Sequence, residues 1–203
     1  MITNAFQSCY LNSNKTNSHF LNIINSPESD YSRYLFFYLG NIIENRDYDI
    51  ANEISKTIEP LKNSLLIAQS KIWIEENNYN KFNNYFSCKS EKDLLAEFFF
   101  LIANLYSSQD QFKESNFYLN ISNYLNPKFY FNLSLLADNY YLNDNLILAK
   151  KTLNKFSNKE EIYHWYKIKK FTQFLSQQEG DDVAIAYFEK KINNFKNPSN
   201  KIL

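Results

Sequence analysis

The chain has 203 residues, of which 22 are Lys or Arg and 22 are Asp or Glu. Because the formal net charge is zero, the protein creates no overall field that would attract nucleic acid or an anionic membrane. No stretch reaches the roughly 18 apolar residues of a membrane span, so composition favours protein or peptide partners and predicts no nucleic acid and no membrane span.

Residues 2–27 predict a first, shortened helical hairpin. Phe6 belongs to its first helix and Phe20 to its second. The polar residues between them form a loose linker. Pro27 closes the unit, because proline cannot continue a helix.

Residues 29–60 predict a second hairpin. The run YSRYLFFYLGNIIEN is a strongly apolar helix, Arg46 begins a turn, Tyr48 opens the second helix and Pro60 ends it. Glycine inside a helix costs about 1 kcal/mol relative to alanine. We therefore expect Gly40 to allow a close approach of another helix.

Residues 61–90 predict a third hairpin, with Leu65 and Trp73 in its first helix and Tyr79 at the start of its second. Phe82 occupies the position where a small residue would let the two helices cross closely. We therefore expect a wider hairpin, or a shortened second helix that ends near Cys88.

Residues 94–127 predict the most regular unit, because very small residues recur at the points where two helices would cross. Antiparallel helices approach closely only where one side chain is small and bulky neighbours fill the remaining space. The small residues are Ala103, Ser115 and Ser122, and Pro127 ends the unit. The bulky residues are Phe99, Ile102, Tyr106, Phe112 and Leu119.

Residues 128–157 repeat this pattern 34 positions later. The matching pairs are Ala103 and Ala137, Tyr106 and Tyr140, Asp110 and Asp144, and Ser115 and Ala149. The chain has only two glycines, so we expect Asn clusters such as Asn77-Asn78 and Asn143-Asp144-Asn145 to form the turns, since Asn tolerates left-handed backbone. A last unit spans 159–195, with its turn at Gly180, and 196–203 is expected to fray.

This order of large and small residues, above all Phe99, Ile102-Ala103, Tyr106, Ser115, Ser122 and Pro127, resembles the tetratricopeptide repeat (TPR), whose period is 34 residues. The resemblance covers roughly residues 30–192. It implies an all-α, right-handed solenoid of five to six antiparallel helix hairpins in a single domain, 1–203. Proteins of this family are interaction scaffolds, so the resemblance implies a protein that is not an enzyme.

In this family the first helix of each hairpin lines a concave groove that holds partner peptides. Carried over to this chain, the partner-binding residues would be Phe100, Asn104, Leu101, Ser134, Asp138, Tyr141, Lys71 and Lys169. The same inner surface would include Phe36, Phe37, Glu97, Leu135, Lys170 and Gln173. The alternative is that Phe100, Leu101 and Leu135 pack against the neighbouring repeat and bind no partner.

Motifs for catalysis, cofactors and metals are missing. Gly40 and Gly180 cannot form a glycine-rich phosphate loop. Cys9 and Cys88 stand 79 residues apart without CxxC spacing, which predicts free thiols and no metal site. His164 lies three and four residues after two glutamates, a spacing common on solvated helix faces. The lysines at 167, 169 and 170 likewise predict a solvated face rather than an RNA-binding edge.

The sequence thus predicts a protein- or peptide-binding scaffold whose partner it does not identify. One alternative is a structural spacer or an oligomerisation segment that stacks on another copy or on further repeats of a longer chain. Another is a helical appendage of a larger enzyme or assembly protein. The first residues show no secretory signal, so cytoplasm is the default location, with other compartments open if the chain belongs to a longer protein.

Overall fold

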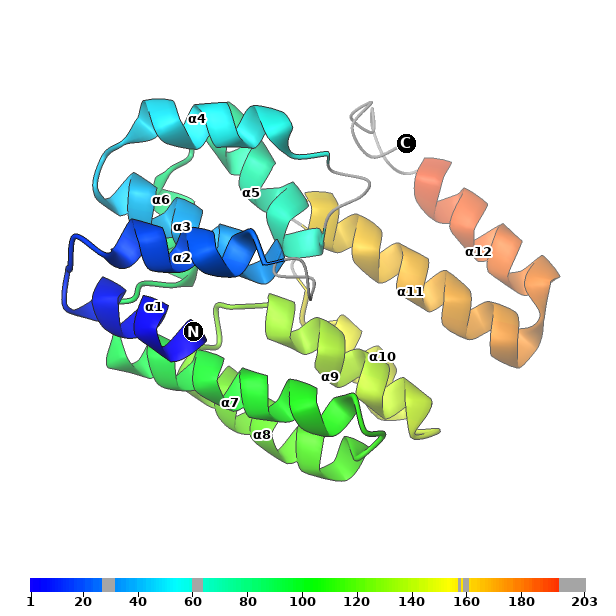
Figure 1. The fold of residues 1–203 in the computed structure, drawn as a ribbon. Helices are drawn as coiled ribbons and strands as arrows, with labels where there is room; N and C mark the ends of the chain where they lie inside the picture. Colours follow the sequence, from blue (N-terminus) through cyan, green and yellow to red (C-terminus); the bar gives the residue numbers. More distant parts are fainter. Residues whose placement is uncertain (27–31, 60–63, 157, 159–160, 194–203) are drawn as a thin grey trace.

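The computed structural model describes residues 1–26, 32–59, 64–156, 158 and 161–193, and within these ranges it contains twelve α-helices and no strand (Figure 1). The first six are α1 (Ile2–Tyr10), α2 (Thr16–Ile24), α3 (Ser32–Glu44), α4 (Tyr48–Thr57), α5 (Leu65–Glu75) and α6 (Asn80–Tyr85). The others are α7 (Glu91–Ser107), α8 (Phe112–Leu125), α9 (Phe131–Leu142), α10 (Leu146–Leu153), α11 (Glu161–Glu179) and α12 (Asp181–Asn193). The predicted all-α class is confirmed.

Helices that follow one another in the chain pack in pairs, and the most extensive contact joins α7 to α8. The pairs α9–α10, α11–α12 and α1–α2 come next, and α8 also packs on α9 (Figure 1). The short helix α6 ends at Tyr85. Its shortness matches the expectation from Phe82, whose fully buried ring occupies space that a small residue would have left free.

A residue with left-handed backbone follows the first helix of each pair in the described part of the chain. These residues are Asn12, Arg46, Asn77, Asp110, Asp144 and Gly180, with φ between 52° and 94°. Their intervals are 34, 31, 33, 34 and 36 residues. The prediction that Asn and Asp take the place of glycine in these turns is confirmed at Asn77 and Asp144.

Five of these turns share one hydrogen-bond pattern. After α7, the Asp110 amide donates to the Ser107 carbonyl at 3.1 Å and the Gln111 amide to the Tyr106 carbonyl at 3.0 Å. The same pair of bonds, spanning three and five residues, closes α1, α3, α5 and α9. This is the Schellman motif, which satisfies the last carbonyls of a helix and turns the chain sharply.

The small residues predicted at the helix crossings of 94–127 are buried. Ala103, Ser115 and Ser122 have no exposed surface. The serines also act as polar links to α9, because Ser122 Oγ accepts from Asn132 Nδ2 and Ser115 Oγ accepts from Asn139 Nδ2, each at 2.7 Å. Small size therefore allows the crossing of α7 and α8, and the hydroxyl groups fasten the next helix to it.

Replacing Ala103 with Phe should lower the free energy of unfolding by about 1–3 kcal/mol, because the added ring has no space at the α7–α8 crossing. Asn104→Ala, one residue away on an exposed position, is the matched control and should change stability by less than about 0.5 kcal/mol. Urea unfolding of both variants measures the difference. The reverse order of stabilities would show that the register of α7 is wrong.

Gly40 does not have the role that we expected for it. A methyl group built on Gly40 would meet only a ring carbon of Phe82, at 4.0 Å, which is an ordinary contact distance. The space beside Gly40 is filled by the Phe82 side chain, not by the backbone of another helix. The close helix approach predicted here is therefore absent.

Arg33, in the first turn of α3, connects α3 to α7 and α9. Its guanidinium makes two contacts with the Glu97 carboxylate of α7, and Nε lies 2.7 Å from Oε1. It also donates to Asn132 Oδ1 of α9 at 2.9 Å. Burial raises the pKa of Glu97 above its ordinary value, and Arg33 offsets part of that rise.

Aromatic rings surround this buried ion pair. The guanidinium carbon of Arg33 lies 3.6 Å from the ring centre of Phe100 and 4.9 Å from those of Phe129 and Phe131. Rings at such distances attract a cation through their quadrupoles.

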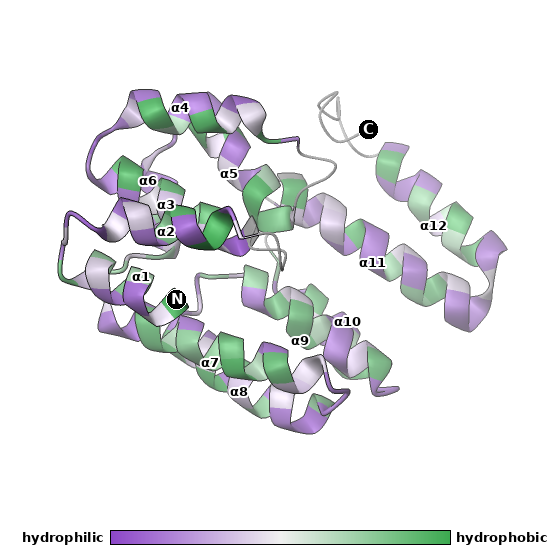
Figure 2. Cartoon of the chain, viewed as in Figure 1, coloured by the Kyte–Doolittle hydropathy of each residue, from purple (hydrophilic) through white to green (hydrophobic). Residues whose placement is uncertain are grey.

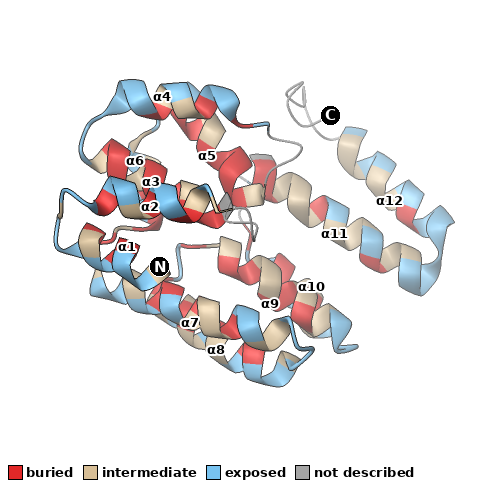
Figure 3. Ribbon diagram, viewed as in Figure 1, coloured by how far each residue is buried: buried red, intermediate tan, exposed pale blue. Residues whose placement is uncertain are grey.

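The first half of the chain folds back on the second, because Arg33 of α3 binds α7 and α9, and α5 packs on α11 (Figure 3).

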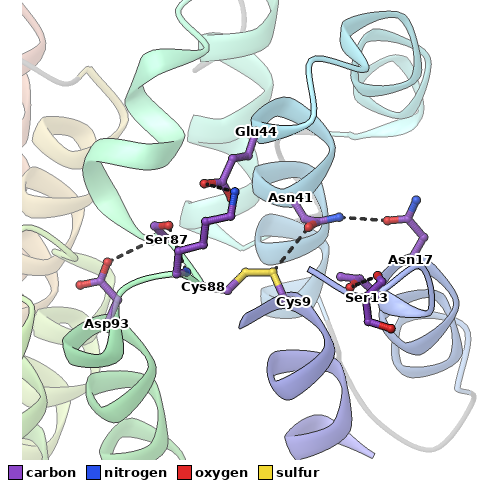
Figure 4. The surroundings of a disulfide bond; sticks show 10 residues. Cys9, Ser13, Asn17, Asn41, Glu44, Ser87, Cys88 and Asp93 are labelled. Carbon is purple, nitrogen blue, oxygen red and sulfur yellow. Dashed lines mark hydrogen bonds and ion pairs between the residues drawn. A yellow bond between two sulfur atoms is a disulfide. The ribbon is translucent and has the colours of Figure 1, made fainter. Parts of the chain in front are cut away.

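Cys9 and Cys88 form a disulfide, which corrects the prediction of free thiols (Figure 4). The bond fastens the end of α1 to the loop between α6 and α7. Both cysteines are buried, and Asn41 Oδ1 lies 3.5 Å from Cys9 Sγ. A disulfide sulfur carries no hydrogen, so this is a close contact and not a hydrogen bond. Spacing along the chain gave no sign that the two residues meet.

Across the described ranges, none of the helices combines the length and the apolar character that crossing a membrane requires. Pro127 follows directly after α8 and its cap residue Asn126. Two other predicted helix ends, Pro27 and Pro60, lie outside the described residues. The predicted frayed tail, 196–203, does as well.

Candidate functional site

Most of the predicted groove residues of α9 and α11 come together on one surface. Ser134, Asp138 and Tyr141 lie on α9, and Lys170 lies on α11. Lys169, the preceding residue of α11, is exposed. Lys170 Nζ donates to Asp138 Oδ1 at 2.6 Å, and both side chains are partly accessible. This ion pair ties the two helices together at the surface.

Aromatic contacts hold the same two helices in register. Tyr141 stacks on Phe174 with ring centres 4.2 Å apart and planes 15° apart. The ammonium of Lys170 lies 5.7 Å from the ring centre of Tyr166. Burial, and then the Asp138 carboxylate, raise the pKa of the Tyr166 hydroxyl, while the Ser134 hydroxyl opposes the rise. Tyr166 is therefore neutral at any physiological pH.

A pocket of about 430 Å³ opens at the end of this surface, where α9 turns into α10. It is lined by Tyr141, Leu142, Asp144, Leu146, Gln177 and Gln178. The two glutamines offer both donors and acceptors, which suits the amide groups of a peptide backbone. Leu142 and Leu146 add apolar surface for a side chain. The volume admits a short peptide segment.

The remaining predicted groove residues are dispersed. Phe100 is buried under Arg33, so the prediction that it faces a partner is wrong for this structure. Asn104 is exposed, while Leu101 and Leu135 are half-buried and pack on the core. Lys71 Nζ donates to the Ile58 carbonyl at 2.7 Å and lies 4.0 Å from Glu75, which gives it a structural role.

The continuous inner groove is not present over α3 and α7. Phe36, Phe37 and Glu97, which we expected to line it, are buried. The physical reason is packing from several sides. Phe36 contacts the rings of Phe82 and Phe129, and Phe37 contacts those of Phe86 and Phe129. Glu97 is buried in its ion pair with Arg33. Among the predicted inner-surface residues in the described part of the chain, Asn104 of α7 and the α9–α11 group stay accessible.

The sequence missed several residues of this surface. Phe174, Gln177 and Gln178 lie on α11, beyond the residues that the repeat pattern assigns to an inner face. They follow one another at three- and four-residue intervals from Lys170, so the helical period of α11 could have found them.

Elsewhere in the described residues, no group of three His, Cys, Asp or Glu side chains is arranged as a metal site. Burial, followed by Lys167 and Lys191, lowers the pKa of His164. The imidazole is therefore mostly neutral near pH 7.

Comparisons with protein-family models, with curated proteins and with solved structures returned no significant match for this chain. Its function has to be inferred from the α9–α11 surface and from the exposed faces of the other helices.

Proposed function

We propose that this protein is a TPR-like solenoid scaffold that binds a protein or peptide and catalyses no reaction. The observation that carries the proposal is the recurrence of one Schellman turn at intervals of 31–34 residues, together with the buried small residues at the α7–α8 crossing. Chains that repeat a helix pair in this way present extended surfaces for partners. The closure at Arg33 makes this array more compact than an open superhelix.

The α9–α11 surface is the binding site in this proposal. Its residues stand on two helices held in register by the Tyr141–Phe174 stack, so the surface is rigid before a partner arrives. A partly exposed ion pair contributes only about 0–1 kcal/mol. A charged group of the partner can therefore replace one member of the Asp138–Lys170 pair at little cost. The peptide backbone would then reach Gln177 and Gln178.

Site-specific photocrosslinking in cells tests this proposal. A benzoylphenylalanine at position 178 should crosslink to a discrete partner, whereas the same group at position 53, on the exposed outer side of α4, should not. Adding Tyr141→Ala should reduce the crosslink at 178 at least about tenfold, because truncating a central aromatic contact typically costs more than 1 kcal/mol.

Three controls make the result decisive. The Tyr141→Ala variant must keep its helical circular dichroism, which separates lost binding from lost folding. Crosslinks between two copies of the chain are recognised by their mass and are not counted. Equal crosslinking at positions 178 and 53, or an unchanged yield with Tyr141→Ala, would contradict a binding site on α9–α11.

A further inference from the structure

Three helices form a face that carries almost no charge. Across Ile2–Tyr10 of α1, 94–107 of α7 and 115–125 of α8, Glu97 is the single charged residue. Its carboxylate is buried against Arg33. In a chain with 22% charged residues, chance would place roughly seven charges in these 34 positions. Solvent-exposed helix faces are ordinarily rich in charge, so this face departs from the rest of the molecule.

The same face exposes large apolar side chains. Leu95 is 50% exposed, Phe98 57%, Leu105 62% and Phe117 62%. Ring contacts connect Phe98 of α7 to Phe117 of α8 through two half-buried rings: Phe98 to Phe99 at 6.2 Å, Phe99 to Tyr118 at 6.1 Å, and Tyr118 to Phe117 at 5.3 Å. The apolar residues of α7 are visible in Figure 2. A continuous exposed patch of this kind marks an interaction site.

The exposed side chains of Leu95, Phe98, Leu105 and Phe117 form a ridge. A groove of about 310 Å³ lies beside it, between α1 and α7. Ile2, Phe6, Leu94, Leu95 and Phe98 contribute to its apolar lining. At one end the Tyr10 hydroxyl donates to Glu91 Oε1 at 2.9 Å, which ties the last turn of α1 to the first turn of α7. The face therefore has a ridge and a groove of matching apolar character next to each other.

We propose that a second copy of this chain covers the α1–α7–α8 face, forming a two-fold symmetric dimer. In such a dimer each residue near the axis meets its own counterpart, so any charge there would oppose an identical charge. Glu91 lies at one end of the groove, and the rest of the face carries no exposed charge, so this obstacle is absent near the axis. A ridge beside a groove also lets each copy insert apolar side chains such as Phe98 into its partner. This inference goes beyond the proposed peptide site, which lies on α9 and α11.

The size of the face fits a dimer interface. The charge-free part of α7, 94–107 with 14 residues, is about 21 Å long, and three adjacent helices at spacings of 8–10 Å add a width of roughly 18 Å. This outline of roughly 380 Å² per copy, enlarged somewhat by the uneven side-chain surface, places the interface in the small class below about 1,200 Å² in total, which is typical of weak association. An anionic membrane would instead require Lys or Arg on this face, and 94–107 and 115–125 contain neither.

Sedimentation velocity of the full chain tests the dimer. Between about 1 and 100 µM, the wild type should convert from monomer to dimer, as expected for micromolar self-association. Phe98→Asp should weaken association at least about tenfold, because it places a charge in the centre of an apolar interface. Ile147→Asp is the matched control, since Ile147 is an exposed apolar residue on α10, and it should leave the dimer intact.

Several outcomes would overturn the proposal. They are a wild type that remains monomeric at 100 µM, a dimer that Phe98→Asp leaves unchanged, and a dimer that Ile147→Asp disrupts equally. If Phe98→Asp does not fold, Leu105→Asp replaces it with the same expectation, because Leu105 is also more than half exposed. Tyr141→Ala should not alter the dimer, so this result and the photocrosslinking result are independent.

Discussion

Glu97→Ala should lower the free energy of unfolding by about 3–5 kcal/mol, because it leaves the Arg33 guanidinium buried without its carboxylate. For a chain of this size the melting temperature should fall by roughly 6–20 °C. The aromatic rings around Arg33 cannot replace the lost partner, since they offer no strong hydrogen-bond acceptor. Thermal melts followed by circular dichroism measure the change.

Two further variants separate the ion pair from other causes. Lys89→Ala removes the ion pair between Lys89 and Glu44, which is 3.2 Å long and half exposed, and it should cost less than about 1 kcal/mol. Arg33→Met combined with Glu97→Leu should recover most of the stability lost in Glu97→Ala, because apolar replacement of a buried pair is often neutral or stabilising. If Glu97→Ala melted like Lys89→Ala, α3 would not be closed onto α7 in solution.

A small effect of Glu97→Ala would also change which residues of the predicted groove are accessible. The Arg33 guanidinium carbon lies 3.6 Å from the ring centre of Phe100, so loss of the Arg33 contact would uncover Phe100. Phe37 would stay buried, because it also packs on Phe86 and Phe129. The Glu97→Ala melt therefore distinguishes a molecule in which Arg33 holds α3 to α7 and covers Phe100 from one in which it does not.

Local features of the fold could be predicted from the sequence because they depend on neighbours. Ala103 and Ser115 are buried where α7 and α8 cross, and Asp144 adopts the left-handed conformation two residues before α10 begins. Each of these follows from side-chain size or backbone preference within a few turns of helix. The repeat period extends that reasoning from one hairpin to the next.

The contacts of Arg33 with α7 and α9 could not be predicted, because they join residues far apart in the chain. Arg33 and Glu97 are 64 residues apart, and Arg33 and Asn132 are 99 apart. The repeat pattern placed Phe100 on the inner side of α7, but such a pattern specifies contacts between adjacent units only. Whether that side faces solvent or another helix is decided by small rotations accumulated over several hairpins.

The disulfide belongs to the same class of long-range contact. Two cysteines 79 residues apart become partners only after α1 is laid against the loop before α7. Disulfides persist in oxidising compartments and are rare in the cytosol. The default cytoplasmic location predicted from the missing signal stays a prediction.

Replacing both cysteines with alanine should lower the free energy of unfolding by about 2–5 kcal/mol. The chain-entropy model gives roughly 4.5 kcal/mol for a cross-link that closes about 80 residues, because the reduced unfolded chain gains the freedom that the bridge removes. Guanidinium unfolding with and without dithiothreitol measures the effect. The reductant should bring the wild type close to the Cys9→Ala, Cys88→Ala variant and leave that variant unchanged. Identical wild-type curves in both buffers, together with two titratable thiols in the unfolded protein, would show that the cysteines are free.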